Sequence, residues 1–130
     1  MKTKLPLTLP KLRKKADRMF SRKRRQEEKD KFGNAICITC GCRRYWQELD
    51  AGHFIQREHL ATRYEKDNVW PQCVKCNRFK GGRYSIYRDN LIEKIGREKV
   101  EWLEHKKYET VIFARSFYEQ VIDDCKDGTR

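Results

Sequence analysis

Two closely spaced cysteine pairs constrain the fold of this 130-residue chain more than any other feature. Cys37 and Cys40 form one C-x-x-C pair, and Cys73 and Cys76 form a second pair after 32 intervening residues. Each pair can place two thiolates on one ion from a tight turn, so together they predict a tetrahedral structural zinc site. Four thiolates leave no open coordination position, which suits a structural role. Two disulfides are the alternative, and an intracellular location would disfavour them.

The composition explains why such a chain needs a stabilising element besides its hydrophobic core. Hydrophobic residues make up 38% of it and charged residues another 38%, with a mean hydropathy of −1.00. A short chain this polar buries a small core and relies on a metal or a partner subunit. It contains no run of 18 apolar residues and no apolar leader, so we expect a cytoplasmic protein that does not enter membranes.

The positive charge is concentrated near the N-terminus. Lys and Arg number 31 against 19 Asp and Glu, a net charge of +12. Residues 1–31 hold 13 basic and 4 acidic side chains, which is +9 of that total. A local excess of this size indicates a polyanionic partner, with nucleic acid as the first candidate. A basic protein that is merely soluble is the alternative.

The pattern along the chain predicts an α+β fold in one compact domain. We expect a basic N-terminal arm and helix in residues 1–34, a zinc-stapled core in residues 35–83 and a helical tail in residues 84–130. The N-terminal helix is expected over residues 11–31, with Gly33-Asn34 ending it. One narrow stripe of this helix carries Leu12, Ala16, Met19, Phe20 and Lys23.

In the core, strands are expected in residues 46–55 and around residues 68–70. A helix should start after Cys76 and stop at Gly81-Gly82. The tail should be helical with breaks near Gly96 and Tyr108.

Three polar residues between and beside the cysteine pairs suggest chemistry. The zinc would hold the strand with Asp50 and His53 against the helix start at Asn77, although strand alternation puts Asp50 and His53 on opposite faces. Carboxylate and amide oxygens suit Mg²⁺ or Mn²⁺, and a neutral His can take a proton from water. The set fits phosphodiester hydrolysis with one metal ion. An ordinary polar pair of Asp and His is the alternative reading.

C-x-x-C, DAGH, DN, QC-x-x-CN and GG appear in this order between residues 37 and 82. With this series of motifs the chain resembles the NinG (Rap) family of lambdoid phage recombination proteins, which belong to the HNH, or ββα-metal, endonucleases. The resemblance implies a zinc-stapled ββα-metal core with His53 as general base, Asn77 as a metal ligand and Asn68 fixing the loop between the strands. Many HNH enzymes carry the second ligand just before the base, where this chain has Gly52. Asp50 is therefore either a direct ligand, a ligand through water or a group that orients the base.

The resemblance further implies a metal-dependent, structure-selective DNA endonuclease for branched recombination intermediates such as Holliday junctions and D-loops. It implies a homodimer and a phage or prophage protein acting in the bacterial cytoplasm. The alternatives are an HNH nuclease or nickase of other specificity and a non-catalytic zinc module that binds nucleic acid. Tyr45, Trp46 and Tyr64 are candidates for stacking on unpaired bases, with core packing as the other use for at least two of them. The basic residues predicted to contact nucleic acid are Lys14, Arg18, Arg22, Arg25, Arg57, Arg78, Lys80 and Arg83.

Overall fold

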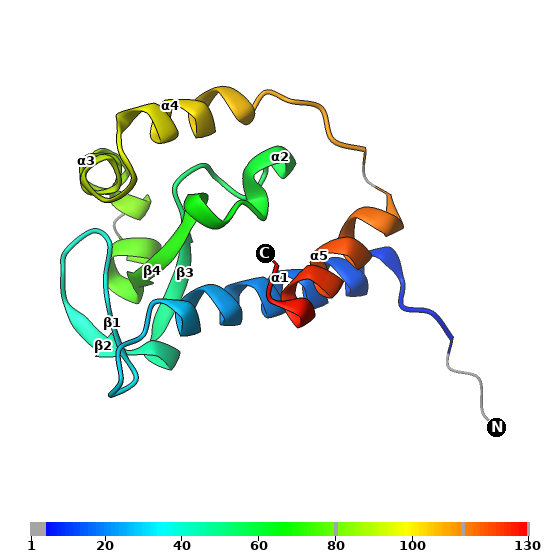
Figure 1. Ribbon diagram of the computed structural model, residues 1–130, viewed down its shortest axis with the longest axis horizontal. Coiled ribbons are helices and arrows are strands. Elements are labelled where there is room, and N and C mark those ends of the chain that lie inside the picture. The colour runs from blue at the N-terminus through cyan, green and yellow to red at the C-terminus, as the bar shows by residue number, and fades with distance from the viewer. Residues whose placement is uncertain (1–4, 80, 113, 130) are drawn as a thin grey trace.

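A hairpin of two five-residue strands forms the middle of the molecule. The structure is a computed structural model that describes residues 5–79, 81–112 and 114–129. Strand β3 (Leu49–His53) pairs antiparallel with β4 (Val69–Cys73), with Leu49 opposite Cys73 and His53 opposite Val69. Helices lie on both sides of this hairpin (Figure 1). Both predicted strands are present, but the first is shorter than the expected residues 46–55, because Trp46–Glu48 form a 3-10 turn, and β4 extends beyond residues 68–70 into the second cysteine pair.

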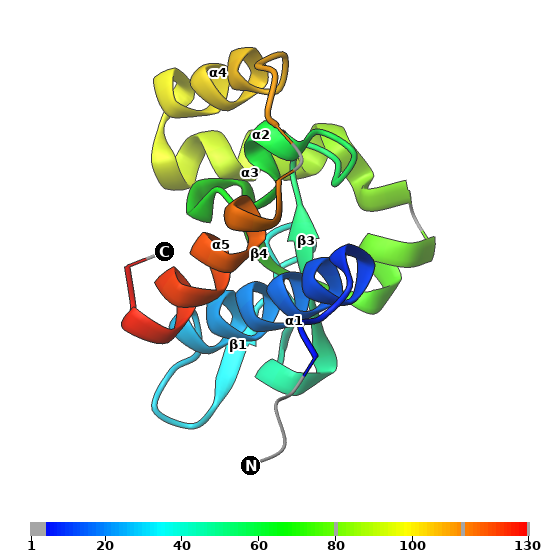
Figure 2. The same cartoon turned by 90° about the vertical axis from the view of Figure 1, so that its right-hand side faces the viewer.

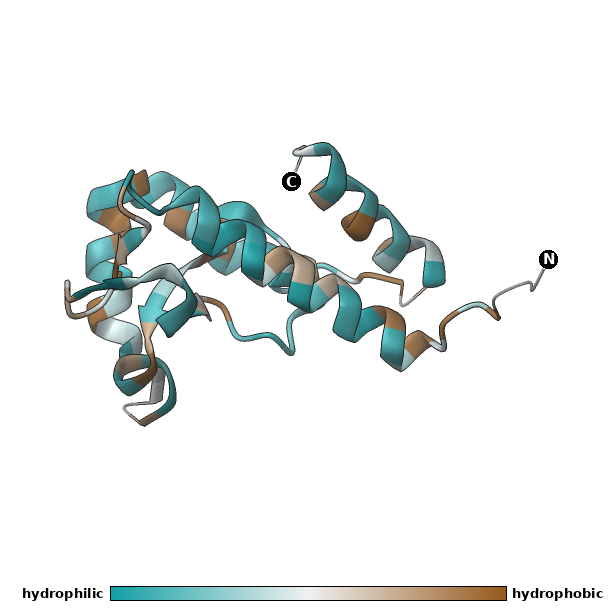
Figure 3. Cartoon of the chain, turned by 90° about the horizontal axis from the view of Figure 1, so that it is seen from below, coloured by the Kyte–Doolittle hydropathy of each residue, from teal (hydrophilic) through white to brown (hydrophobic). Residues whose placement is uncertain are grey.

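Helix α1 (Leu9–Glu27) crosses one side of the hairpin and packs lengthwise against α5 (Arg115–Asp127), as Figures 1 and 2 show. The prediction of a helix over residues 11–31 is wrong at both ends. Pro10 suits the first helical turn, so the helix begins earlier, and the chain turns away after Glu27. Seen from below in Figure 3, the ribbons of α1 and α5 are largely teal, with brown segments where apolar residues lie. The buried cluster on this side comprises Leu12, Ala16, Phe20, Leu60, Tyr64, Val69, Tyr118, Val121 and Ile122.

The buried stripe of α1 continues to Arg24 and not to Lys23 as predicted. Positions 12, 16, 20 and 24 follow the spacing of four residues that keeps side chains on one helix face. The Arg24 side chain is fully buried, its Nε donates to the Val69 carbonyl at 2.9 Å, and its guanidinium lies 4.7 Å from the Trp70 ring centroid. The planar cation therefore packs on an aromatic face inside the core.

A second core lies on the other side of the hairpin, under α3 (Tyr84–Ile95) and α4 (Arg97–Lys106). The predicted break at Gly96 is confirmed, because this residue has a φ of +92° and separates the two helices. The break near Tyr108 is also confirmed, since α4 ends at Lys106. The buried residues of this cluster are Phe54, Ile55, Trp70, Tyr87, Leu91, Val100 and Leu103.

The remaining elements are short. Strands β1 (Asn34–Ile36) and β2 (Arg43–Tyr45) form a small hairpin around the first cysteine pair, and α2 (Leu60–Arg63) lies in the loop between β3 and β4. The helix predicted after Cys76 is a single wide turn, Lys75–Phe79, since Gly81 adopts a φ of +62° just beyond it. The mixed helix and strand fold is confirmed. Among the described residues, no helix is long and apolar enough to cross a membrane.

Candidate metal centre and active site

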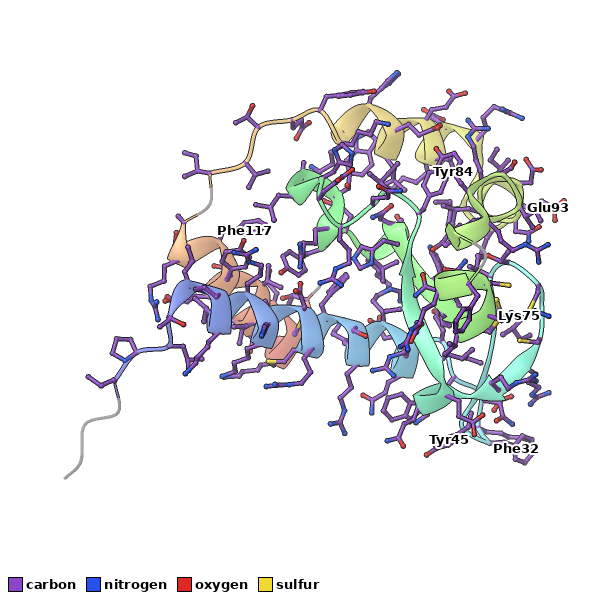
Figure 4. The ribbon with its side chains drawn as sticks, turned by 180° about the vertical axis from the view of Figure 1, so that it is seen from behind. Phe32, Tyr45, Lys75, Tyr84, Glu93 and Phe117 are labelled. Carbon is purple, nitrogen blue, oxygen red and sulfur yellow. The ribbon has the colours of Figure 1, made fainter. Side chains whose placement is uncertain are left out.

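The two cysteine pairs meet at one point, although 32 residues separate them in sequence. The four Sγ atoms of Cys37, Cys40, Cys73 and Cys76 all lie within 4.8 Å of one another, and those of Cys40 and Cys73 are 3.8 Å apart. Zinc–sulfur bonds of about 2.3 Å in a tetrahedron place the sulfurs about 3.8 Å apart. The sulfur atoms gather near the labelled Lys75 in Figure 4. These four side chains fit a metal such as zinc.

The backbone around the cysteines is arranged for thiolates. The Cys40 amide donates to Cys37 Sγ and the Cys76 amide to Cys73 Sγ, each at 3.5 Å. Such N–H···S contacts stabilise negative charge on the sulfur that accepts them. Among the described residues, these four form the single group of three or more His, Cys, Asp or Glu side chains placed to share a metal. Cys42 lies outside that group.

The first cysteine pair is also tied to the central hairpin and to α3. The Ile38 amide donates to the Pro71 carbonyl in β4 at 2.9 Å, and the Gln72 side chain donates to Thr39 Oγ1 at 2.9 Å. Asn90 of α3 donates to the carbonyls of Ile38 and Thr39. A metal at the cysteines would therefore fix the end of β4, and with it the turn that begins just before Asn77.

A cavity of about 400 Å³ lies between α1, β3 and the turn Lys75–Phe79. Asp50, His53 and Asn77 all line this cavity, so the structure brings together the three residues predicted to carry chemistry. Asn77 Nδ2 donates to Asp50 Oδ2 at 2.9 Å. The same cavity is lined by Arg18, Arg25, Arg57 and Arg78, which outnumber the acids Asp17 and Asp50 on its wall and leave it with a net positive charge. An anion such as a phosphodiester suits this environment.

The Asp50 carboxylate has a competitor for any bound cation. Arg78 contacts it with two nitrogens, Nε at 2.9 Å and Nη2 at 2.8 Å. The carboxylate of Asp50 and the amide oxygen of Asn77 are hard donors of the type that Mg²⁺ accepts together with water. The Arg78 side chain is 62% exposed, so it can leave the carboxylate without disturbing the core. The donor set fits a divalent cation once Arg78 moves aside and the Asn77 amide, whose Nδ2 donates to Asp50 here, turns to present its oxygen.

His53 is held in one defined tautomer. Its Nε2 lies 3.0 Å from the Arg63 carbonyl, and because a carbonyl can only accept, Nε2 carries the proton and Nδ1 keeps its lone pair. Burial, assisted by the charges of Arg57 and Arg63, lowers the pKa of His53 to about 4. The imidazole is therefore neutral at neutral pH. Such a ring can accept a proton at Nδ1.

Asp17, an acid on α1 that was not among the predicted site residues, lines the same cavity. It accepts from Arg63 Nε at 2.9 Å, from the Tyr64 hydroxyl at 2.7 Å and from Arg57 Nη2 at 3.3 Å. Burial alone would raise the pKa of Asp17, but the hydrogen bonds from Arg63 and Tyr64 lower it. Asp17 thereby fixes the segment whose carbonyl holds His53. The sequence did distinguish Asp17, because it is the one acidic residue in the strongly basic segment between residues 9 and 25.

Asn68 is fully buried and joins the two ends of the loop between β3 and β4. Its Nδ2 donates to the carbonyls of Ile55 and Thr62, at 3.1 and 3.0 Å, and its Oδ1 accepts from the Ile55 amide at 2.7 Å. Asn68 does not line the cavity, so it contributes by holding the loop that carries Arg63.

Gly52 occupies the position just before His53 because nothing larger fits there. A Cβ added to it would lie 2.2 Å from Gln72 Oε1 and 2.8 Å from Gln72 Cβ, on the neighbouring strand. Gln72 is itself buried and bonded to Thr39. A metal-binding side chain is thus excluded at position 52. The nearest acid on the strand that lines the cavity is Asp50.

The basic residues predicted to contact nucleic acid fall into two groups. Lys14, Arg18 and Arg22 are exposed at intervals of four residues and form one line along α1. The others have protein partners or lie near the site: Arg25 donates to the Leu49 carbonyl, Arg57 pairs with Asp17, Arg78 pairs with Asp50, and Arg83 is half-buried with a φ of +48°. Lys80 lies outside the described residues.

The aromatic residues singled out in the sequence lie mainly in the core. Trp46 and Tyr64 are buried, whereas Tyr45 is 45% exposed on β2. Trp46 and Tyr64 therefore serve in core packing and are too buried to stack on a base.

Comparison with known proteins places the chain in a family. A family model described as "Bacteriophage Lambda NinG protein" matches residues 5–130. The chain belongs to the NinG family. This NinG chain is 34% identical over 99 residues to protein ninG of Salmonella phage P22, covering 71% of the chain and 48% of that relative. It is 32% identical over 99 residues to protein ninG of Escherichia phage lambda, again covering 71% of the chain and 48% of the relative.

The chain thus spans about half the length of the curated NinG proteins it matches. No solved structure matches it. The family membership expected from the motifs between residues 37 and 82 is confirmed.

Proposed function

We propose that this NinG protein is an HNH-type endonuclease that uses a divalent metal ion to hydrolyse phosphodiester bonds in branched DNA. One observation carries the proposal: a single cavity gathers oxygen donors (Asp50 and Asn77), a neutral imidazole with its Nδ1 lone pair available (His53) and four arginines. These are the groups that single-metal phosphodiester hydrolysis requires.

Each residue then has a defined part. The scissile phosphate binds among the cavity arginines, and Arg78 becomes available to it once it releases Asp50. His53 Nδ1 accepts a proton from the attacking water while Nε2 stays bonded to the Arg63 carbonyl. A Mg²⁺ or Mn²⁺ ion held by Asp50 and Asn77 would stabilise charge on the phosphate and on the departing 3′ oxygen. Asp17 and Asn68 act by positioning the loop that holds His53.

The basic line along α1 supports DNA as the substrate. Lys14, Arg18 and Arg22 lie exposed on the same helix that supplies Arg18 and Arg25 to the cavity wall. Phosphates on either side of the cut can therefore follow α1 away from the cavity. A preference for branched DNA follows from the resemblance described above. Symmetric cutting of a four-way junction needs two active sites, so we further propose a homodimer in the bacterial cytoplasm.

The test compares cleavage of a four-way junction with cleavage of a linear duplex of the same sequence. Mg²⁺ is omitted in the control arm and not chelated, because a chelator would also remove a structural zinc ion. We expect cutting of the junction with Mg²⁺, little cutting of the duplex and none without added metal ion.

Two other outcomes would change the assignment. Equal cutting of both substrates would refute the branched-DNA preference and keep a nuclease of broader specificity. Tight binding of both DNAs without cleavage under Mg²⁺ or Mn²⁺ would refute the nuclease and favour a zinc module that only binds nucleic acid.

A further inference from the structure

A second cavity of about 430 Å³ adjoins the candidate active site. The two cavities share Ala51, His53, Arg57 and Asn77 in their walls, so His53 stands between them. Their remaining walls differ in chemistry. The first is lined by arginines and acids, whereas the second is lined by aromatic rings together with Gln56 and Gly81. These rings are Phe54, Tyr84 and Tyr87.

The aromatic wall is rigid. The rings of Phe54 and Tyr84 are stacked, with centroids 4.9 Å apart and an interplanar angle of 13°. The Tyr84 hydroxyl donates to Glu104 of α4 at 3.1 Å, and burial and that carboxylate raise the pKa of Tyr84 to about 12, so the proton stays in place. Tyr87 is fully buried beneath them and donates to the Gly52 carbonyl at 2.7 Å.

Part of this wall faces solvent. Tyr84, labelled in Figure 4 at the start of α3, is 47% exposed even though it stacks on Phe54. A half-exposed aromatic ring held at both its face and its hydroxyl is a preorganised stacking platform. The nearby amide of Gln56 can both donate and accept hydrogen bonds at the edge of a planar ligand.

We propose that this aromatic cavity binds one unstacked nucleobase of the DNA strand whose scissile phosphate lies in the neighbouring cavity. The proposal rests on the proposed function, because the phosphate must occupy the arginine-lined side. Because the two cavities share four wall residues, a base in one and a phosphate in the other can come from the same stretch of strand. The flat faces of any base suit Tyr84, so the cavity selects for an unstacked base and not for a sequence.

This placement supplies a physical reason for choosing branched DNA. A base inside a duplex must be unstacked and unpaired before it can enter such a cavity, at a cost of a few kcal/mol. A base at a branch point or in a single strand already lacks part of that stacking, so it enters at less cost. The aromatic cavity beside the general base would therefore discriminate between a junction and a duplex.

The test measures junction binding without added Mg²⁺, on intact junctions and on junctions carrying an abasic site at each branch-point nucleotide in turn. The variants are Tyr84→Ala, Tyr84→Phe and, as a matched control, Tyr108→Ala, an exposed tyrosine beyond α4. We expect Tyr84→Ala to bind the intact junction about ten-fold more weakly than the wild type. Tyr84→Phe, which keeps the ring, and Tyr108→Ala should stay within about two-fold of it. At one abasic position the difference between Tyr84→Ala and the wild type should vanish.

A ten-fold loss that persists at every abasic position would overturn the proposal, because it would show a purely structural role for Tyr84. Wild-type binding and wild-type cutting by Tyr84→Ala would also overturn it while leaving the nuclease intact. A ten-fold loss for Tyr84→Ala that vanishes at one abasic position, together with no cutting by the wild type, would refute the nuclease and retain the cavity.

A second readout uses the unmodified protein, so it does not depend on the folding of a variant. Photo-crosslinking of a junction with 5-iodouracil at the position found above should attach to the peptide containing Tyr84. Attachment only elsewhere, for example at Tyr45, would contradict the proposal.

Discussion

Replacing Gly52 by alanine should destabilise the protein strongly, although it adds a single methyl group. The new Cβ would lie 2.2 Å from Gln72 Oε1 and 2.8 Å from its Cβ, both far inside van der Waals contact. Gln72 would have to move, which breaks its bond to the buried Thr39 hydroxyl. Overpacking of a core costs about 1–3 kcal/mol, and the loss of the Gln72 donor at the buried Thr39 hydroxyl costs about as much again.

We therefore expect Gly52→Ala to lower the free energy of unfolding by about 3 kcal/mol, or Tm by about 10 °C for a domain of this size. Urea denaturation in a zinc-containing buffer measures this. The double variant Gly52→Ala/Gln72→Ala provides the control. It removes the closest contact but keeps the one at Cβ, so its loss should be smaller than the sum of the single losses. A Gly52→Ala protein within about 0.5 kcal/mol of the wild type would refute the reasoning.

Three further predictions follow from the cysteine cluster and the cavity. The purified protein should hold about one zinc ion per chain by mass spectrometry, and Cys76→Ser should lose both metal and cooperative unfolding while Cys125→Ser keeps them. Because the pKa of His53 is lowered to about 4 in the fold, the unfolded chain binds the proton first as the pH falls. The contribution of His53 to the free energy of unfolding should thus drop by about 2 kcal/mol between pH 7 and pH 5. His53→Gln should flatten that drop in pH-dependent urea melts, and an equally steep profile would show that other groups cause it. Asp17→Asn leaves the Arg63 cation largely buried without its acid and should cost about 2–3 kcal/mol in thermal melts, whereas an unchanged melt would exclude its role in fixing the loop.

The features that could be predicted from the sequence are those encoded locally. A C-x-x-C pair is a turn with its own spacing, so four cysteines sufficed to predict the metal centre. Gly96 and the polar stretch near Tyr108 both predicted the ends of helices. Helix α3 ends at Ile95, just before Gly96, and α4 ends at Lys106, just before Tyr108.

The features that could not be predicted depend on partners distant in sequence. Arg24 looked like a surface residue because its partners, the Val69 carbonyl and the Trp70 ring, lie 45 residues away or more. Asp17 meets Arg63 across 46 residues. Strand alternation gave no reason for Asp50 and His53 to share a site. They do so because the cavity runs along the edge of β3 between α1 and the turn holding Asn77, a tertiary arrangement.

The role of His53 as general base is tested most directly by single-turnover cleavage of a four-way junction in Mg²⁺. His53→Ala is compared with the wild type and with His105→Ala, which removes an exposed histidine on α4. We predict that His53→Ala loses at least about 100-fold in rate while junction affinity stays unchanged, and that His105→Ala cuts like the wild type. Wild-type cleavage by His53→Ala would contradict the account.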